Sequence, residues 1–194
     1  MPPPADPPAA VPLSDPAAAV EQLVLRYLAA YGPASVADIQ AWSGLSRLRE
    51  VTERLGDRLR PLAGPDGAQL LDLPDAPRPD PDVAAPPRFL PAYDNLLFSF
   101  ADRSRVIPHD RPVPLPPGNG ASTGTLLIDG RWQANWKITR GEGQGDKRQA
   151  VLLVQPFARL GTADREAIGA EGAALLAFTA AGADVRDVRF APVG

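Results

Sequence analysis

Five cationic side chains lie in one predicted β-hairpin, between residues 131 and 149 of this 194-residue chain. Arginine and lysine donate charge-assisted hydrogen bonds, and the planar arginine guanidinium matches a phosphate group in a two-point contact. Only two acidic residues, Glu142 and Asp146, lie in the same span. This local excess suits contact with a nucleic-acid backbone, such as that of double-stranded DNA, or insertion into a minor groove. The residues that would make the contact are Arg131, Lys137, Arg140, Lys147 and Arg148. The alternative is a mobile surface loop whose charges serve only solubility.

A second group of charged residues lies on a short helix that the sequence predicts after Gly44. We expect Ser46 to cap this helix. Arg47 and Arg49 then face outward, where arginine side chains can read guanine in the major groove. The alternative is a solvated helix face with ion pairs between side chains four residues apart, namely Arg49–Glu53 and Glu50–Arg54.

Three further features could carry chemistry, but we expect each of them to be structural. The polar residues that follow Pro91 are expected to form ion pairs within the fold; they are Tyr93, Asp94, Asp102, Arg103 and Arg105. The single histidine, His109, lies in a proline-rich loop and is expected to be a surface residue. Trp132 and Trp136 are four residues apart, hence on one face of a strand, and their sequence context favours core packing over base stacking.

The composition excludes several classes of function. The chain has no cysteine and one histidine, which excludes disulfides, thiol catalysis and zinc sites built from these residues. We therefore expect neither a metal nor a cofactor. The net charge of −3 provides no global basic field that would attract nucleic acid. No apolar run approaches the roughly 20 residues that cross a bilayer, and the N-terminus has no secretory signal. We expect a cytoplasmic monomer, since no uncovered apolar stripe is evident.

Proline-rich stretches predict how the chain is divided. Residues 1–14 are rich in proline and alanine and are expected to form a disordered leader. Residues 74–87 contain repeated X-Pro steps, which disfavour helix and predict an extended linker. This linker would separate a first domain, residues 15–73, from a second domain, residues 88–194.

The first domain has the pattern of a winged helix-turn-helix. Asp15 predicts the start of one helix. Ser35, with Asp38 three residues later, predicts a second helix with a capping box. The third helix is the one described above, and two short strands follow it at 58–62 and 69–73. Three helices followed by a β-hairpin are typical of a winged helix-turn-helix.

The second domain is mostly strand. Asp129 and Gly130 predict the turn of a β-hairpin. A helix over residues 162–180 is expected to be capped by Thr162, and a strand of alternating polarity follows at 184–190. These elements predict a small β-barrel or a curled antiparallel sheet with one packed helix. The expected fold class of the whole chain is therefore α+β.

The chain resembles the C-terminal half of the winged-helix DNA-binding family that includes the AlkZ-type DNA glycosylases. The resemblance spans about residues 15–191, and four segments carry it: "YGPASVADIQAWSGLSRLRE", "PPRFLPAYDNLLFSFADRSRVIP", "GTLLIDGRWQANWKI" and "DVRFA". It implies tandem winged helices followed by a β-barrel that embraces DNA. It also implies relatives that excise alkylated or crosslinked bases with a Gln-x-Gln or Gln-x-Asp signature whose middle residue is aliphatic.

This sequence departs from the family at that signature. It contains no Gln-x-Gln, and Gln144-Gly145-Asp146 has glycine in the middle and lies in the predicted hairpin loop. We therefore assign no catalytic residue and expect a DNA-binding winged-helix protein that is not catalytic on its own. One alternative is the C-terminal portion of an active glycosylase completed by an N-terminal segment absent from this chain. A weaker alternative is a winged-helix interaction module without a role on DNA.

Overall fold

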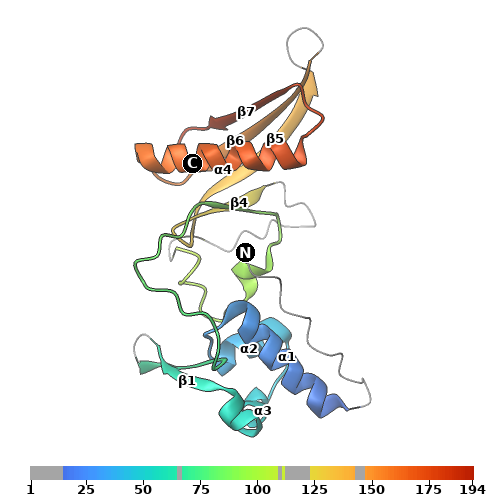
Figure 1. Cartoon of the computed structure of the whole chain (residues 1–194), viewed down its shortest axis with the longest axis vertical. Coiled ribbons are helices and arrows are strands. Elements are labelled where there is room, and N and C mark those ends of the chain that lie inside the picture. Colours follow the sequence, from blue (N-terminus) through green and yellow to red (C-terminus); the bar gives the residue numbers. More distant parts are fainter. Residues whose placement is uncertain (1–14, 65–66, 109–110, 112–122, 143–146) are drawn as a thin grey trace. The chain divides into compact units, whose positions relative to one another are not determined.

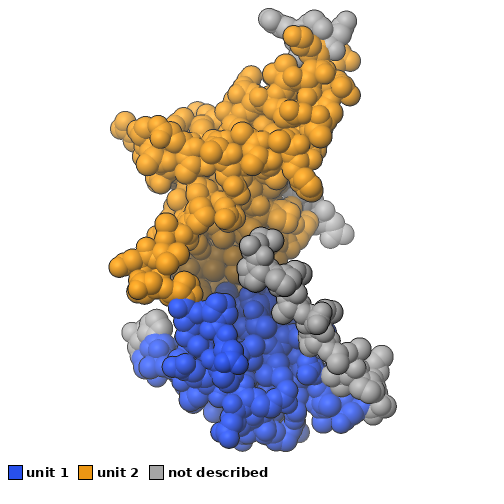
Figure 2. All heavy atoms as spheres, viewed as in Figure 1, with its two compact units in different colours: residues 1–78, 98–102 blue, residues 79–97, 103–194 orange. Residues whose placement is uncertain are grey.

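The computed structural model describes residues 15–64, 67–108, 111, 123–142 and 147–194. These residues form a mixed α+β fold with four α-helices and two β-sheets. The chain divides into two compact units, which Figure 2 shows in different colours. Unit 1 comprises residues 1–78 and 98–102, and unit 2 comprises residues 79–97 and 103–194. The expected leader, residues 1–14, lies outside the described residues.

Unit 1 contains three helices followed by a β-hairpin (Figure 1). In chain order its elements are α1 (Pro16–Tyr31), α2 (Val36–Ser43), α3 (Leu48–Leu55), the 3-10 turn η1 (Gly56–Arg58), β1 (Arg60–Ala63) and β2 (Gln69–Asp72). The strands β1 and β2 pair antiparallel. Ala34, between α1 and α2, exchanges two backbone hydrogen bonds of 2.9 and 2.8 Å with Leu71 of β2. The hairpin is therefore tied to the connection between the first two helices.

Two of the three predicted helix starts in unit 1 are confirmed. The Asp15 side chain accepts the backbone N–H groups of Ala17 and Ala18 at 3.0 and 3.2 Å. Ser35 and Asp38 form the expected capping box, in which each side chain accepts the backbone N–H of the other residue. Short polar side chains thus satisfy N–H groups that the helices leave without a partner.

The predicted cap of α3 by Ser46 is wrong. The cap position belongs to Arg47, which has the left-handed backbone conformation (φ 61°) and makes no side-chain cap. The reason lies in the preceding helix, because Gln40 of α2 accepts the backbone N–H of Leu48 at 3.2 Å through its Oε1 atom. A side chain from a neighbouring element thus replaces the local cap that the sequence pattern predicts.

The segment 98–102 packs as part of unit 1, although the sequence predicts it within the second domain. The Tyr27 hydroxyl donates a buried 2.6 Å hydrogen bond to the backbone carbonyl of Ser99. The backbone N–H of Ala101 donates to Asp38 Oδ1 at 2.8 Å. Phe100 packs edge-on against the ring of Tyr31. Both polar contacts are made by buried side chains of α1 and α2, so this segment completes the core of the helical unit.

Unit 2 is built on one five-stranded sheet in the order β3-β4-β5-β6-β7. Its elements are β3 (Arg88–Leu90), the 3-10 turn η3 (Asn95–Phe98), whose last residue belongs to unit 1, β4 (Gly124–Ile128), β5 (Arg131–Glu142), β6 (Arg148–Pro156), α4 (Thr162–Thr179) and β7 (Val185–Phe190). The first three strand pairs are antiparallel, and β7 pairs parallel to β6 after the α4 crossover.

This topology corrects two expectations about the second domain. Within the described residues the sheet is open, with β3 and β7 at its edges, so a closed barrel does not form. The sheet is also mixed, and not wholly antiparallel, because β7 runs parallel to β6. A helix between two strands is the usual way to connect a parallel pair, and α4 provides that connection.

The helix α4 covers one face of the sheet (Figure 1). Its residues Ile168, Gly172 and Leu176 are buried, and they face a core that includes Leu152 and Val154 of β6. Gly172 permits a close approach, because a Cβ atom there would lie 2.8 Å from Leu152 Cδ2 and 3.2 Å from a methyl of Val188.

The start of α4 also differs from its prediction. Gly161 occupies the cap position without a side-chain contact, whereas Thr162 is already helical. The expected cap by Thr162 is therefore wrong by one residue.

No helix of the described residues is both long and apolar enough to span a membrane.

The two strand tryptophans pack inside unit 2, as expected. Trp132 is buried and meets Phe157 edge-to-face, with 4.9 Å between ring centroids. Trp136 packs edge-to-face on Phe89 and donates its indole N–H to the carbonyls of Leu90 and Thr125. Both rings are held by core contacts.

Candidate nucleic-acid interface

The hairpin of β5 and β6 distributes the predicted cations over both faces of the sheet. Arg140 pairs with Ala150 and Glu142 pairs with Arg148, and side chains of directly paired residues lie on the same face. Arg140, Glu142 and Arg148 therefore share the face that α4 covers. Lys137 is three residues from Arg140, so it lies on the opposite face. Figure 1 shows the end of this hairpin extending beyond α4 within unit 2.

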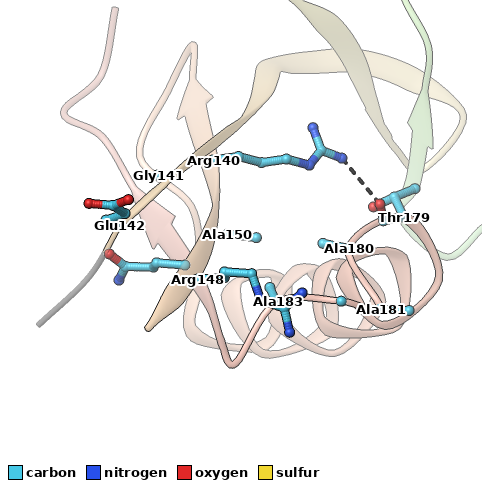
Figure 3. Close-up of a pocket in the computed structure, with 11 residues that line it drawn as sticks. Arg140, Gly141, Glu142, Arg148, Ala150, Thr179, Ala180, Ala181 and Ala183 are labelled. Atoms are coloured by element: carbon cyan, nitrogen blue, oxygen red, sulfur yellow. Dashed lines mark hydrogen bonds between the residues drawn. The ribbon is translucent and has the colours of Figure 1, made fainter. Parts of the chain in front are cut away.

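A pocket of about 530 Å³ lies where the hairpin leaves α4 (Figure 3). We call it the hairpin pocket; it is lined by Arg140, Gly141, Glu142, Arg148, Gln149, Ala150 and residues 179–183. Small residues of the α4–β7 turn form much of its wall. Arg140 reaches across it and donates from Nη2 to the carbonyl of Thr179 at 3.1 Å. The pocket thus combines two guanidinium groups with a mainly small-residue lining.

Arg148 is held on one side of this pocket by Asp184. Its Nε and Nη2 atoms each lie 3.4 Å from a carboxylate oxygen of Asp184, and its backbone N–H donates to the same carboxylate at 2.9 Å. The side-chain hydrogen bonds from Arg148 lower the pKa of Asp184, and the backbone hydrogen bond lowers it further. Asp184 therefore presents a negative charge directly to one of the predicted DNA-binding residues.

Arginine side chains also form hydrogen bonds with backbone carbonyl groups at the C-terminal end of α4. Arg186 donates from Nε to the carbonyl of Ala180 at 3.0 Å and from Nη2 to that of Ala181 at 2.6 Å. Together with Arg140, it satisfies carbonyl groups at the helix end, where cations are favoured by the helix dipole. Part of the positive charge around the pocket is therefore engaged by the protein backbone.

The five predicted hairpin cations do not form one cluster. Arg131 begins β5, nine residues before Arg140, which places it roughly 30 Å away at about 3.4 Å per residue. Its guanidinium donates to the carbonyl of Ser104 at 3.1 Å. Lys137 lines a separate small cavity with Asn135 on the other face. Lys147 is exposed and directly precedes β6. Only Arg140 and Arg148 meet at the hairpin pocket.

The predicted residues of α3 lie in unit 1. Arg47 and Arg49 are both exposed. Arg49 lines a groove of about 340 Å³ with Glu53 and residues of the β1–β2 hairpin. The two ion pairs considered for α3 are absent from the described residues. Instead, Glu21 of α1 lies 3.4 Å from Arg54 and 3.7 Å from Arg58. A tertiary contact thus replaces the local pairing.

The remaining candidates are placed as follows. Asp94 accepts the backbone N–H of Leu96 at 2.9 Å, a local turn contact. His109 and the Gln144-Gly145-Asp146 segment lie outside the described residues. Among the residues that are described, no group of three or more histidine, aspartate or glutamate side chains could hold a metal ion.

Sequence reasoning missed Asp184 and Arg186, which contact residues that line the hairpin pocket. Asp184 is 36 residues from Arg148, and its position before β7 gave no local sign of this contact. The parallel pairing of β6 with β7 brings the two together, because Gln149 pairs with Val185. The sequence does contain a strand, a helix and a strand in this order over residues 148–190. Because this order favours a parallel pair, it was the signal that could have identified both residues.

The chain was compared with known families, curated proteins and solved structures. The family described as "DNA glycosylase AlkZ-like" matches residues 1–178. This range reaches from before α1 almost to the end of α4, so it includes parts of both units. No curated protein and no solved structure matches the chain. The family match confirms the AlkZ-like family that the resemblance implies, and it does not test the placement as the C-terminal half of a winged-helix protein.

Proposed function

Since the chain belongs to the AlkZ-like family of DNA glycosylases, we propose that it binds double-stranded DNA through the basic end of the β5–β6 hairpin. The family indicates a DNA-repair-related function. The observation that carries the proposal is the position of Arg140, Lys147 and Arg148. All three are exposed at the distal end of the β5–β6 hairpin, and β7 joins this sheet beside β6 from Gln149 onward. The end of such a hairpin can enter a groove of DNA.

Hydrogen-bond donors that the protein leaves available support this proposal over a solubilising surface. Arg140 and Arg148 each keep guanidinium N–H groups beyond those they use within the described residues, since an arginine has five such donors. Phosphate contacts from such groups supply most of the sequence-independent affinity for DNA. A local basic ribbon can therefore bind DNA although the whole chain is acidic, with a net charge of −3.

We further propose that unit 1 is a winged helix-turn-helix. Its elements support this interpretation by their order, which is one helix, then Ala34 bridged to Leu71 of β2, then two further helices and a β-hairpin. In that fold α3 would be the helix that enters the major groove, with Arg47 and Arg49 towards DNA. Glu50 and Glu53 are exposed on the same short helix and would repel phosphate. A packing role for this helix is therefore the alternative.

The test of DNA binding is fluorescence anisotropy with a labelled duplex of about two helical turns, measured between about 50 and 200 mM salt. The wild-type affinity should fall steeply as salt rises. The variant Arg140→Ala/Lys147→Ala/Arg148→Ala should bind more weakly, and its log–log salt slope should be smaller by about 2 to 3, since each phosphate contact contributes roughly 0.9.

The control variant is Arg26→Ala/Arg159→Ala/Arg189→Ala, which removes the same charge from exposed positions that are not part of the β5–β6 hairpin. Its salt slope should stay close to that of the wild type. Absence of binding at low salt, or equal losses in the two variants, contradicts the proposal.

A second candidate function is base excision. The printed description of the matching family, a DNA glycosylase, favours it. Because the sequence contains no Gln-x-Gln, this chain would then supply the DNA-binding portion, and the catalytic glutamines would come from another segment. An assay for free base released from an alkylated duplex, by this chain alone, tests whether the chain carries its own catalytic group.

A further inference from the structure

We propose that the hairpin pocket is a binding site for one phosphodiester group of the DNA backbone, and that Asp184 competes with this phosphate for Arg148. The inference rests on the proposed function, because it assigns a ligand and a regulating residue to the same hairpin. In the absence of DNA, the Asp184 carboxylate contacts the Arg148 guanidinium. When DNA binds, a phosphate oxygen replaces Asp184 as the partner of this guanidinium.

The pocket is large enough to admit a phosphate group, and it is lined by two arginines and one acidic residue, Glu142. Arg140 and Arg148 line it from neighbouring strands, and their backbones are held by the β5–β6 pairing. Arg140 uses one Nη2 contact to Thr179, which fixes its direction across the pocket. Arg148 Nη1 lies 3.6 Å from the position that a Cβ atom on Gly182 would take. That distance is an ordinary van der Waals contact, so Gly182 lies directly beside this guanidinium on the pocket wall.

The contact between Arg148 and Asp184 has the properties of an exchangeable ion pair. Both of its side-chain distances are 3.4 Å, longer than the 2.7–2.9 Å of a strong charge-assisted hydrogen bond. The two side chains are 71% and 46% exposed, and such surface pairs are weak. By contrast, the backbone N–H of Arg148 holds the carboxylate at 2.9 Å. Asp184 can thus keep its place while it releases the guanidinium.

A second ion pair on the neighbouring strand provides a matched control. Asp187 and Arg189 of β7 lie 2.7 Å apart, with side chains 43% and 57% exposed. Neither residue lines the hairpin pocket. Asp187→Asn therefore changes the net charge as Asp184→Asn does, but leaves the proposed phosphate site intact.

The first measurement is duplex affinity by anisotropy. In Asp184→Asn the amide oxygen can still accept the Arg148 backbone N–H, but the competing charge is lost. We expect binding about two- to fivefold tighter than wild type, the range that corresponds to a surface ion pair. Asp187→Asn should bind like wild type. An unchanged or weaker affinity of Asp184→Asn overturns the inference, because Asp184 then does not compete with DNA.

The second measurement separates the pocket from DNA binding as a whole. Inorganic phosphate is titrated into the full chain while the Nε–Hε NMR signals of arginine side chains are recorded. We expect saturable shifts at Arg140 and Arg148, with tighter phosphate binding in Asp184→Asn. If these signals do not move although the duplex binds, the phosphate site is wrong and the proposed function stands. If they shift but no duplex binds, the pocket binds free phosphate but not the DNA backbone, and the proposed function is wrong.

Discussion

At the scale of single residues, Asp184 shows how one carboxylate reduces the positive charge beside the hairpin pocket. It meets Arg148 through two side-chain contacts and one backbone contact. The arginine hydrogen bonds stabilise the ionised carboxylate and thereby lower its pKa. Because Asp184 stays ionised down to acid pH, the net charge at the hairpin pocket is smaller than its arginines alone would give.

The pH dependence of this contact follows from the direction of the pKa shift. A folded-state pKa below that of the unfolded chain means that the contact stabilises the folded state above the unfolded pKa of about 3.9. This contribution is lost as the pH falls through the lowered folded pKa. An NMR titration of the Asp184 carboxyl should give a midpoint below the ordinary value, and Arg148→Gln should move it back. A midpoint that is the same in both proteins contradicts the assignment.

At the scale of elements, the packing of α4 on the sheet depends on the absence of a side chain at Gly172. A Cβ atom there would meet Leu152 and Val188 at 2.8 and 3.2 Å. Leu152 is fully buried, so it has little room to move. By contrast, a Cβ atom on Gly169 of the same helix would meet nothing within 4 Å.

Two glycine variants therefore separate helix propensity from packing. Alanine favours helix over glycine by about 1 kcal/mol, so Gly169→Ala should raise the free energy of unfolding by up to that amount. Gly172→Ala gains the same propensity but overpacks the interface, which costs about 1–3 kcal/mol. Urea unfolding should therefore rank Gly169→Ala above Gly172→Ala by about 1–3 kcal/mol. Equal stabilities would show that the helix moves freely away from the sheet.

Elements with local causes could be predicted from the sequence. The turn between β4 and β5 needs two residues with positive φ, and Asp129 and Gly130 have φ values of 50° and 69°. The capping box of α2 joins residues only three apart. Such signals lie within a few positions of each other, so the sequence pattern contains both partners.

Features that depend on distant partners could not be predicted. The start of α3 is satisfied by Gln40 of the preceding helix, and no pattern within α3 reveals this. The parallel placement of β7 beside β6 depends on how α4 crosses the sheet, and it decides that Asp184 reaches Arg148. The five hairpin cations are exposed, and the groups that contact them come from distant parts of the chain; their contact with DNA stays a prediction.

At the scale of the whole molecule, the chain passes between its two units three times, after residues 78, 97 and 102. The short segment 98–102 returns to unit 1 and binds there through Tyr27 and Asp38. The core of the helical unit is therefore built from two separate parts of the sequence.

The contribution of this returning segment can be measured in the full chain. Tyr27→Phe removes the hydroxyl that donates to Ser99, so this buried hydrogen bond is lost, at a cost of about 0.5–1.5 kcal/mol in unfolding free energy. Tyr31→Phe is the control, because Tyr31 meets Phe100 through its ring, and its effect should stay within about 0.5 kcal/mol. If Tyr27→Phe unfolds like the control in urea, the segment does not stabilise unit 1.

The returning segment has a practical consequence for dissecting the protein. A gene fragment that stops at residue 78 would encode every helix of unit 1 but would omit the residues that Tyr27 and Asp38 contact. A fragment in which residues 98–102 follow residue 78 through a short spacer should therefore be more stable than a fragment that simply ends at residue 78. For the same reason, a protease nick between residues 79 and 97 would leave its two products held together by this peptide.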